Sequence, residues 1–521
     1  MQPASVHRRI PWSQTATLLG LYIAISAITR LVVSGNDIVN VDESSYMVGG
    51  WELLSGHLPY AGFADNKPPL IYVYYALTQL LGHGMWSVRV VTMLVTVPLT
   101  ALAASAFYRH DRRGIAAALA YLVFGAAYDA GEMLAVNCEL VMMLPLAWAI
   151  VLVRDESRLS QRRTLGVGVL IGIASLVKYQ AVLWVPAIMA AIVVARSRGG
   201  MAVLLRTVVV TVAGLMIPVA AAVTVFAAAG GIEGFFYWNV THNIGYVMNP
   251  TTAADAVARG TTQLMPFLAV TSVLWLGVGR SFAMAPSRYW KILVGGLIAA
   301  SVAAASIGLR FFPHYFVQLY IPLAIGTAPW IATLFVWPLT TAAWATAVYS
   351  LAVWTIFTAS NTVRFVSSRP TLNVTSLRVA ERLRRDSCYE HASMFVWGSA
   401  PIFYYHAELP LASRFFFPEF PLVPLYAGNR RSTERHARPI VRDRRGRHWR
   451  WLMADLRRSE PTYILDTAPA HLKMWEYFPL SDYPQLERFV RRRYDVMESI
   501  DGVQIYKRRG CDVTVMAAAN Q

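Results

Sequence analysis

The chain has 521 residues, of which 56% are hydrophobic and only 15% are charged, and its formal net charge is +17. Soluble globular proteins average about 25% charged residues, so this composition excludes a protein that is water-soluble throughout. Its basic residues follow a membrane pattern, which makes anionic lipid surfaces the expected partners and argues against binding of nucleic acid.

The first predicted membrane span covers residues 13–34, and we interpret it as a retained anchor because the preceding residues show no cleavable signal peptide. A polar loop follows at 35–67. Residues 68–82 are apolar but shorter than the roughly 20 residues that a crossing needs, so they predict a helix lying at the membrane interface. Further spans are predicted at 86–108, 114–131, 140–153, 164–180, 181–195, 204–228, 263–279, 289–307, 314–336 and 339–358. The total is about eleven crossings.

Lysine and arginine in the short loops predict the orientation, because they favour the cytoplasmic side. If residues 68–82 do not cross, all the basic loops fall on one side, together with the N-terminus. These loops carry Arg8 and Arg9, then Arg109, Arg112 and Arg113, then Arg154, Arg158, Arg162 and Arg163, then Arg196 and Arg198, and then Arg280, Arg288 and Lys291. The opposite loops, and everything after residue 358, are then predicted to face outward.

Residues 359–521 differ in kind, because they are rich in arginine and contain no apolar run long enough to span. Short β-like runs occur at 394–398, 462–466 and 503–508, and amphipathic helical patterns occur near 374–385 and 449–458. The sequence therefore predicts two units. Residues 1–358 form a mainly α, polytopic membrane domain, and residues 359–521 form a small α/β domain outside the membrane.

Three cysteines, Cys138, Cys388 and Cys511, are too few and too scattered for a metal cluster. A Cys388–Cys511 disulfide is compatible with an oxidising compartment, and free thiols are equally compatible with the sequence.

The outward loops share one property, which is that ionisable residues stand close to the ends of the spans. The set comprises Asp42, Glu43, Lys67, Asp129, Glu132, Glu139, Lys178, Arg310 and His314, with Asn137 among them. Charged groups at membrane depth are costly and usually face a polar cavity. A carboxylate can accept a proton from a hydroxyl, and cations can hold a phosphate as it leaves. The set therefore predicts displacement of a lipid-linked phosphate by a hydroxyl near the outer surface.

The first outer loop contains Asp42-Glu43, Tyr46, a Gly56 to Tyr60 stretch and Lys67-Pro68-Pro69. This pattern resembles the GT-C membrane glycosyltransferases, in particular glycosyltransferase family 39, the protein mannosyltransferases and the lipid A aminoarabinose transferase. Further similar stretches follow in order at 135–147, 172–182 and 310–322.

The resemblance implies a sugar donor on a polyprenyl phosphate, an acceptor at the outer membrane face and an inverting displacement. It implies that Asp42, beside Glu43, is catalytic, either as the general base or as a carboxylate that orients the acceptor. It also implies a set of substrate-binding residues, namely Tyr46, Lys67, Glu139, Lys178, Arg310 and His314. The implied location is a bacterial inner membrane, with the N-terminus in the cytoplasm.

Two departures from the family pattern leave the sugar and the acceptor (lipid, glycan or protein) open. Ser45 stands where the aminoarabinose transferases have Arg, and Asn137-Cys138-Glu139 stands where some relatives have Asp. Metal dependence also stays open, because neighbouring carboxylates can bind a divalent ion while lysines can stabilise a phosphate without one.

Each candidate residue also has an ordinary structural explanation. Asp42 and Glu43 suit a helix N-terminus, and Lys67 and Lys178 could reach the interface from buried stems. Arg89 could simply anchor a helix end. At the level of function, the main alternative is a transporter or flippase of lipid-linked sugars, which would need charged residues near the membrane midplane. A structural scaffold is the third reading.

Overall fold

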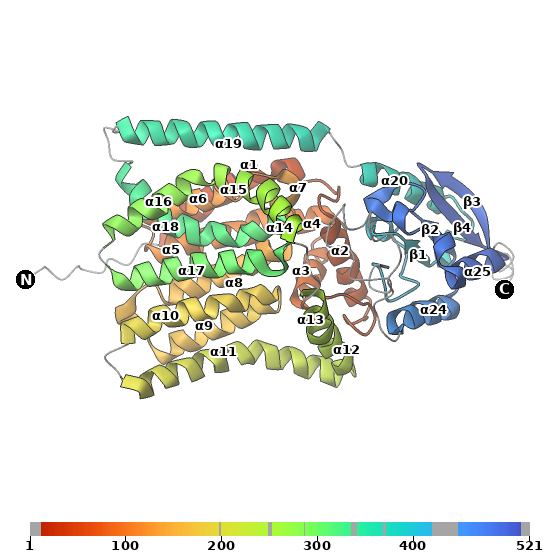
Figure 1. The fold of residues 1–521 in the computed structure, drawn as a ribbon, viewed down its shortest axis with the longest axis horizontal. Coiled ribbons are helices and arrows are strands. Elements are labelled where there is room, and N and C mark those ends of the chain that lie inside the picture. The colour runs from red at the N-terminus through yellow and green to blue at the C-terminus, as the bar shows by residue number, and fades with distance from the viewer. Residues whose placement is uncertain are drawn as a thin grey trace, which may run out of the picture.

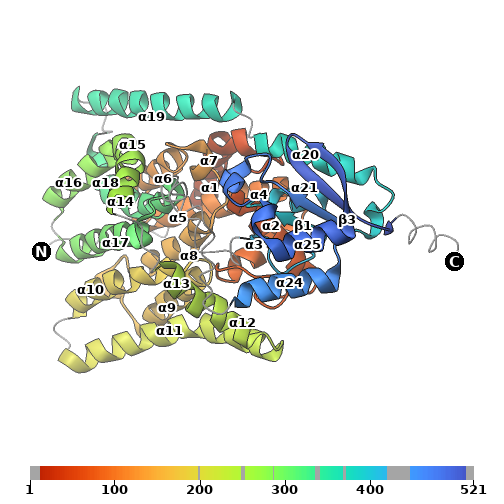
Figure 2. The same ribbon diagram turned by 45° about the vertical axis from the view of Figure 1, so that its right-hand side comes forward.

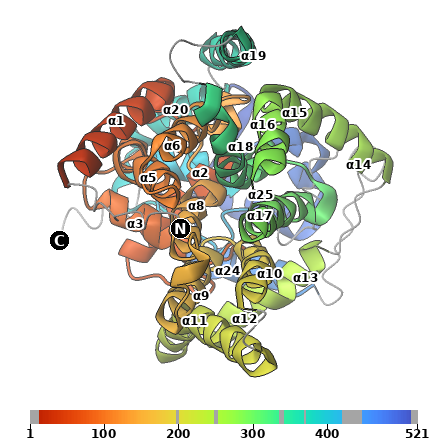
Figure 3. The same cartoon turned by 90° about the vertical axis from the view of Figure 1, so that its left-hand side faces the viewer.

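The computed structural model describes residues 12–196, 200–247, 253–285, 287–334, 341–367, 371–418 and 446–511. Apolar helices run side by side in a bundle (Figure 1). They are α1 (Trp12–Arg30), α4 (Met85–Val91), α5 (Val97–Phe107), α6 (Arg112–Phe124), α8 (Cys138–Leu152), α9 (Gln161–Ser175), α10 (Trp184–Arg196), α11 (Gly200–Ala228), α15 (Met265–Val270), α16 (Ser272–Met284), α17 (Arg288–Ser306), α18 (Tyr320–Leu334) and α19 (Thr341–Ser367). Viewed along the bundle, they surround a core to which α5, α8 and α18 contribute (Figure 3).

Within the described residues, six helical segments are long and apolar enough to cross a membrane, or seven if Ala256–Val270 and Ser272–Met284, bent by 65°, form one span. The chain is therefore a multi-pass membrane protein, but the predicted total of about eleven crossings is not confirmed. Three predicted spans correspond to helices shorter than the roughly 20 residues of a full crossing, since α6, α8 and α9 have 13, 15 and 15 residues.

Short helices gather at the end of the bundle that faces the C-terminal unit, and this end is called the outer end after the predicted orientation (Figure 1). They are α2 (Val41–Leu54), α3 (Leu70–Gln79), α7 (Ala130–Met133), α12 (Ile232–Phe236), α13 (His242–Val247) and α14 (Ala253–Arg259). With 10 residues, α3 is too short to cross a bilayer, in agreement with the interfacial helix predicted at 68–82.

Helices α2 and α3 form a closely packed pair because α2 carries two adjacent glycines. A Cβ atom on Gly49 would lie 2.4 Å from the Tyr72 ring, and one on Gly50 would lie 3.0 Å from the Ala76 backbone nitrogen. Both distances are too short for a larger residue, so these glycines fix how closely the two outer helices approach.

The C-terminal unit is built on a four-stranded sheet of order β1-β2-β4-β3. Its elements are α20 (Thr371–Arg384), β1 (Met394–Trp397), α21 (Ile402–Ala407), α24 (Arg447–Ser459), β2 (Tyr463–Asp466), α25 (Pro484–Arg493), β3 (Tyr494–Ile500) and β4 (Val503–Arg508). Strands β1 and β2 are parallel, and the other two pairings are antiparallel. A disulfide joins Cys388 to Cys511, so of the two alternatives that the sequence left open, a disulfide or free thiols, the structure contains the disulfide. The predicted α/β character is confirmed, and the domain boundary at residue 358 stays a prediction, since α19 continues to Ser367.

The C-terminal unit lies at one end of the bundle, with α2 and α3 between the bundle and the sheet (Figures 1 and 2). Asn373 of α20 pairs with the backbone of Ile38, accepting from its N–H at 3.0 Å and donating to its carbonyl at 2.7 Å. On the other side of the loop, the Ala64 N–H donates to the Arg414 carbonyl at 2.8 Å. The outer loop is thus held from both sides by the C-terminal unit.

Candidate active site

Asp42 lies in the first turn of α2, where local sequence fixes the start of the helix. The Asn40 side chain accepts a hydrogen bond from the Asp42 N–H at 2.9 Å, and the Glu43 carboxylate accepts one from the Asn40 N–H at 3.3 Å. This capping box satisfies N–H groups that the first helical turn leaves without partners. It also holds Asp42 and Glu43 in different environments.

The Asp42 carboxylate is half-buried and faces cations from three other segments. The Tyr46 hydroxyl, one turn along α2, donates to its Oδ2 at 3.3 Å. Burial alone would raise the pKa of Asp42, but the positive charges of Lys67, His314 and Lys178 outweigh burial and lower that pKa below its ordinary value. Asp42 is therefore an ionised acceptor of protons at neutral pH.

Glu43 points into the protein, away from this arrangement. Its oxygens accept both Nη1 and Nη2 of Arg89 at 2.5 and 2.7 Å, and its Oε1 also accepts the Val136 N–H at 2.7 Å. Glu43 and Arg89 are 0% and 1% exposed. Of the two carboxylates predicted as catalytic, only Asp42 faces the cations. Arg89, for which we considered only a helix anchor, fixes the base of the outer loop.

Lys67 lies in the loop just before α3, whose N-cap is Pro69. Burial would lower the pKa of Lys67, but Asp42 and Asp65 raise it, so the ammonium stays protonated. Sequence reasoning missed Asp65, which is 1% exposed and accepts hydrogen bonds from the Tyr72 hydroxyl and the Asn66 N–H, both at 2.5 Å. Its position two residues before Lys67 was the available signal.

Lys178 lies where α9 ends, and the two lysine-bearing segments meet there, because the Leu70 N–H donates to the Leu176 carbonyl at 2.9 Å. The Lys178 ammonium forms an ion pair with Glu139 of α8 and lies 4.6 Å from the centre of the Tyr315 ring. Glu139 is 1% exposed, so it acts from beneath Lys178 as a buried counter-charge.

His314 connects these groups to α2. Its Nδ1 lies 2.5 Å from Glu132 Oε2 and its Nε2 lies 4.0 Å from Glu139 Oε1. Glu132 in turn accepts a hydrogen bond at 3.0 Å from Asn40, the cap of α2. A continuous polar network therefore runs from the N-terminus of α2 through His314 to Lys178.

Tyr46 and Arg310 complete the predicted set. The Tyr46 hydroxyl accepts a hydrogen bond from the Cys138 thiol at 3.4 Å, and this bond joins α2 to the start of α8. Arg310 is 3% exposed, and its pKa is lowered by burial against an opposing effect of Tyr315, the residue whose ring lies beneath Lys178. Residues from five separate segments are thus gathered at the outer end of the bundle.

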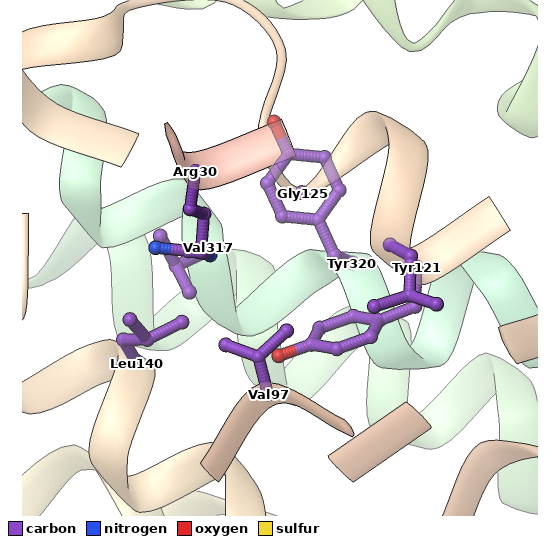
Figure 4. Close-up of a pocket in the computed structure, with 8 residues that line it drawn as sticks. Arg30, Val97, Tyr121, Gly125, Leu140, Val317 and Tyr320 are labelled. Atoms are coloured by element: carbon purple, nitrogen blue, oxygen red, sulfur yellow. The ribbon is translucent and has the colours of Figure 1, made fainter. Parts of the chain in front are cut away.

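A cavity lies deeper in the bundle and shares no lining residue with this group. It is lined by Arg30, Val97, Tyr121, Leu122, Gly125, Leu140, Val317 and Tyr320 (Figure 4). Arg30 donates to the Leu134 carbonyl at 3.3 Å, the same carbonyl that Arg89 contacts at 3.4 Å. The charged groups described in the preceding paragraphs therefore do not line this cavity.

Among the described residues, no group of three or more His, Cys, Asp or Glu side chains is arranged to hold a metal ion. Positive charge at the site comes from lysine and histidine side chains.

Comparison with known proteins gives one family match and several structural matches. Residues 66–226 match the family described as dolichyl-phosphate-mannose-protein mannosyltransferase. No curated protein matches the chain significantly.

Among solved structures, ArnT from Cupriavidus metallidurans bound to undecaprenyl phosphate aligns with a TM-score of 0.57 at 12% identity, covering 95% of this chain and 98% of that one. Its apo form gives a TM-score of 0.55 at the same identity and coverage. The Archaeoglobus fulgidus oligosaccharyltransferase in the apo form gives 0.48 at 10% identity, covering 95% of this chain and 75% of that one. The resemblance predicted from the first outer loop is confirmed.

Proposed function

We propose that this chain is a membrane glycosyltransferase of the GT-C superfamily, related to the protein mannosyltransferases and ArnT. In this proposal the enzyme moves a sugar from a polyprenyl-phosphate donor to an acceptor hydroxyl at the outer face of a bacterial inner membrane. The observation that carries it is the half-buried Asp42 carboxylate facing Lys67, His314 and Lys178.

Asp42 is the general base of the proposed reaction. It accepts the proton of the acceptor hydroxyl while the hydroxyl oxygen forms a bond to the anomeric carbon of the sugar. The bond between that carbon and the phosphate oxygen breaks, and the electron pair leaves on the polyprenyl phosphate. Attack on the face opposite the leaving group inverts the anomeric centre. The Tyr46 hydroxyl orients the carboxylate, and Glu43 acts as a positioning residue through Arg89.

Lys67 and Lys178 are the proposed ligands of the donor phosphate. The phosphate gains one negative charge when the sugar leaves, so nearby cations stabilise the transition state more than the bound substrate. Glu139 and His314 hold Lys178 in place, and Arg310, beside Tyr315, adds positive charge to the same end. The undecaprenyl phosphate bound to the structurally similar ArnT supports a donor of this lipid class.

Mass spectrometry of envelope glycolipids and glycoproteins tests this proposal in cells that produce the wild-type chain, Asp42→Ala or no chain at all. We expect one glycosylated species to depend on the chain and to be lost with Asp42→Ala. The matched control is Glu52→Gln, which removes another carboxylate of α2, the one that contacts His57 at 2.7 Å. An unchanged glycan profile with Asp42→Ala contradicts the proposed base. Movement of lipid-linked sugar by the wild-type chain in proteoliposomes, without covalent transfer, would favour a flippase.

A further inference from the structure

Helix α24, which begins at Arg447, lies beside the outer helices α12 and α13 in both ribbon views (Figures 1 and 2). The Arg447 guanidinium lies 5.4 Å from the centre of the Tyr237 ring and 5.8 Å from that of Trp451. Cations within about 6 Å of an aromatic ring are attracted to it. Two rings from different parts of the chain therefore hold this guanidinium in place.

Among the described residues, the hydrogen-bond donors of Arg447 have no acceptor. In the part of the chain that the structure describes, no carboxylate or other hydrogen-bond acceptor pairs with Arg447, which is half-exposed. Arg414 provides the contrast, because it lies 5.1 Å from the same Trp451 ring but forms two hydrogen bonds, at 2.8 and 3.0 Å, to the buried Asp455. A guanidinium that is fixed by rings and keeps its planar array of donors is suited to bind a phosphate or carboxylate.

The same segment reaches the proposed active site. Tyr237 begins a π-helical turn, η6 (Tyr237–Thr241), whose Asn239 accepts a hydrogen bond from Tyr60 at 3.2 Å. The Tyr60 hydroxyl also donates to the Lys67 carbonyl at 2.6 Å. Asn243, just beyond this turn, donates to the Asn66 carbonyl at 2.9 Å. Arg447 is thus coupled, through one turn of helix, to the loop that carries Lys67.

We propose that Arg447 binds an anionic group, a phosphate or a carboxylate, on a sugar of the acceptor. The Tyr237 hydroxyl, 2.6 Å from His448 Nε2, keeps the outer helices docked on α24 and so keeps the two rings in place around Arg447. The acceptor is then an anionic glycan or the glycosylated headgroup of a lipid. The assignment of this anion to the acceptor rests on the proposed function, whereas binding of an anion at Arg447 does not.

Calorimetric titration of the full chain in phosphatidylcholine nanodiscs tests this site, with undecaprenyl phosphate present in excess so that the proposed donor site is filled. The probes are glucose 1-phosphate, glucuronate and neutral glucose. We expect the two anionic sugars to bind, glucose not to bind, and Arg447→Gln to weaken the anionic sugars by about tenfold or more. Arg450→Gln, an exposed arginine of the same helix, is the matched control and should change binding by less than about twofold.

Three results would overturn the proposal: unchanged binding in Arg447→Gln, equal weakening in Arg450→Gln, or glycerol phosphate binding at Arg447 as tightly as the anionic sugars. The last result would assign the site to ordinary lipid headgroups. Arg447→Lys, which keeps the charge but not the fork of donors, separates loss of recognition from loss of folding and should bind more weakly than wild type. Lys67→Met should leave glucuronate binding intact, so failure of the donor assignment and failure of the Arg447 site are distinguishable.

Discussion

Replacing Arg89 with Met should destabilise the outer loop more than any surface substitution. The change removes the cation from a pair whose members are 1% and 0% exposed and leaves the Glu43 carboxylate buried. Removing one partner of a buried ion pair typically costs about 3–5 kcal/mol. Glu43 would keep the N–H groups of Val136, Val39 and Asn40 as hydrogen-bond donors. We therefore expect the free energy of unfolding to fall by about 3 kcal/mol, at the lower end of this range.

A double-mutant cycle with Arg89→Met, Glu43→Gln and the double variant measures this interaction by thermal unfolding of the purified protein. The double variant should be less destabilised than the sum of the two single variants, with a coupling of about 1–3 kcal/mol. Hydrogen exchange should become faster in residues 38–46 of Arg89→Met, because Glu43 also caps α2.

Arg113→Met provides the matched control for this cycle. It breaks a pair with Asp111 whose members are 52% and 41% exposed, and such pairs contribute about 0–1 kcal/mol. If Arg89→Met costs no more than Arg113→Met, or if the cycle shows no coupling, Glu43 and Arg89 do not fix the loop as described.

Three further predictions concern the hydrogen bonds from Asn373 to the outer loop and the carboxylates of Asp466 and Asp42. Asn373→Ala removes both hydrogen bonds to Ile38, so it should lower the transfer rate and speed hydrogen exchange at residues 36–40, whereas Ser459→Ala, which removes a bond within the C-terminal unit, should do neither. Burial raises the pKa of Asp466 to about 6, so its charged form destabilises the fold above that pH; Asp466→Asn should therefore stabilise the protein by up to about 3 kcal/mol at pH 8 in thermal unfolding, with the gain vanishing below about pH 4. Because the pKa of Asp42 is lowered, a pH–rate profile should show no loss of kcat/KM from protonation of the base as the pH falls from about 7 to 5, and a loss centred in that range would contradict Asp42 as the base.

Chain-local features were predictable from the sequence. The interfacial helix at 68–82 followed from its length, and three of the four strands of the C-terminal sheet followed from short β-like runs. Strand β3 was missed because residues 494–500 show no regular alternation of apolar and polar residues and directly follow the arginine-rich end of α25. The number of spans stays a prediction, because apolar composition does not show where a helix ends, as in α6, α8 and α9.

Which residues pair with which was much harder to predict. The first-loop pattern singled out Asp42, Glu43 and Lys67, but a sequence cannot show that neighbouring carboxylates on one helix turn point to different surroundings. The Arg89 partner of Glu43 is 46 residues away, and the Glu132 partner of His314 is 182 residues away. Such pairs form only when separate helices pack together. Asp65 was overlooked because in the sequence it is a single acid in a loop, and its hydrogen bond with Tyr72 becomes visible only in the fold.

The most direct measurement separates donor binding from sugar transfer in the purified protein, with undecaprenyl phosphate as the binding probe and the cellular donor and acceptor identified by mass spectrometry as substrates. Asp42→Asn should bind undecaprenyl phosphate within about twofold of wild type while transfer falls by at least about a hundredfold, since a general base contributes about 10²–10⁴ to a rate. Lys67→Met should instead weaken binding of the lipid. Transfer by Asp42→Asn at a rate close to that of the wild type, or undiminished lipid binding by Lys67→Met, would contradict the account.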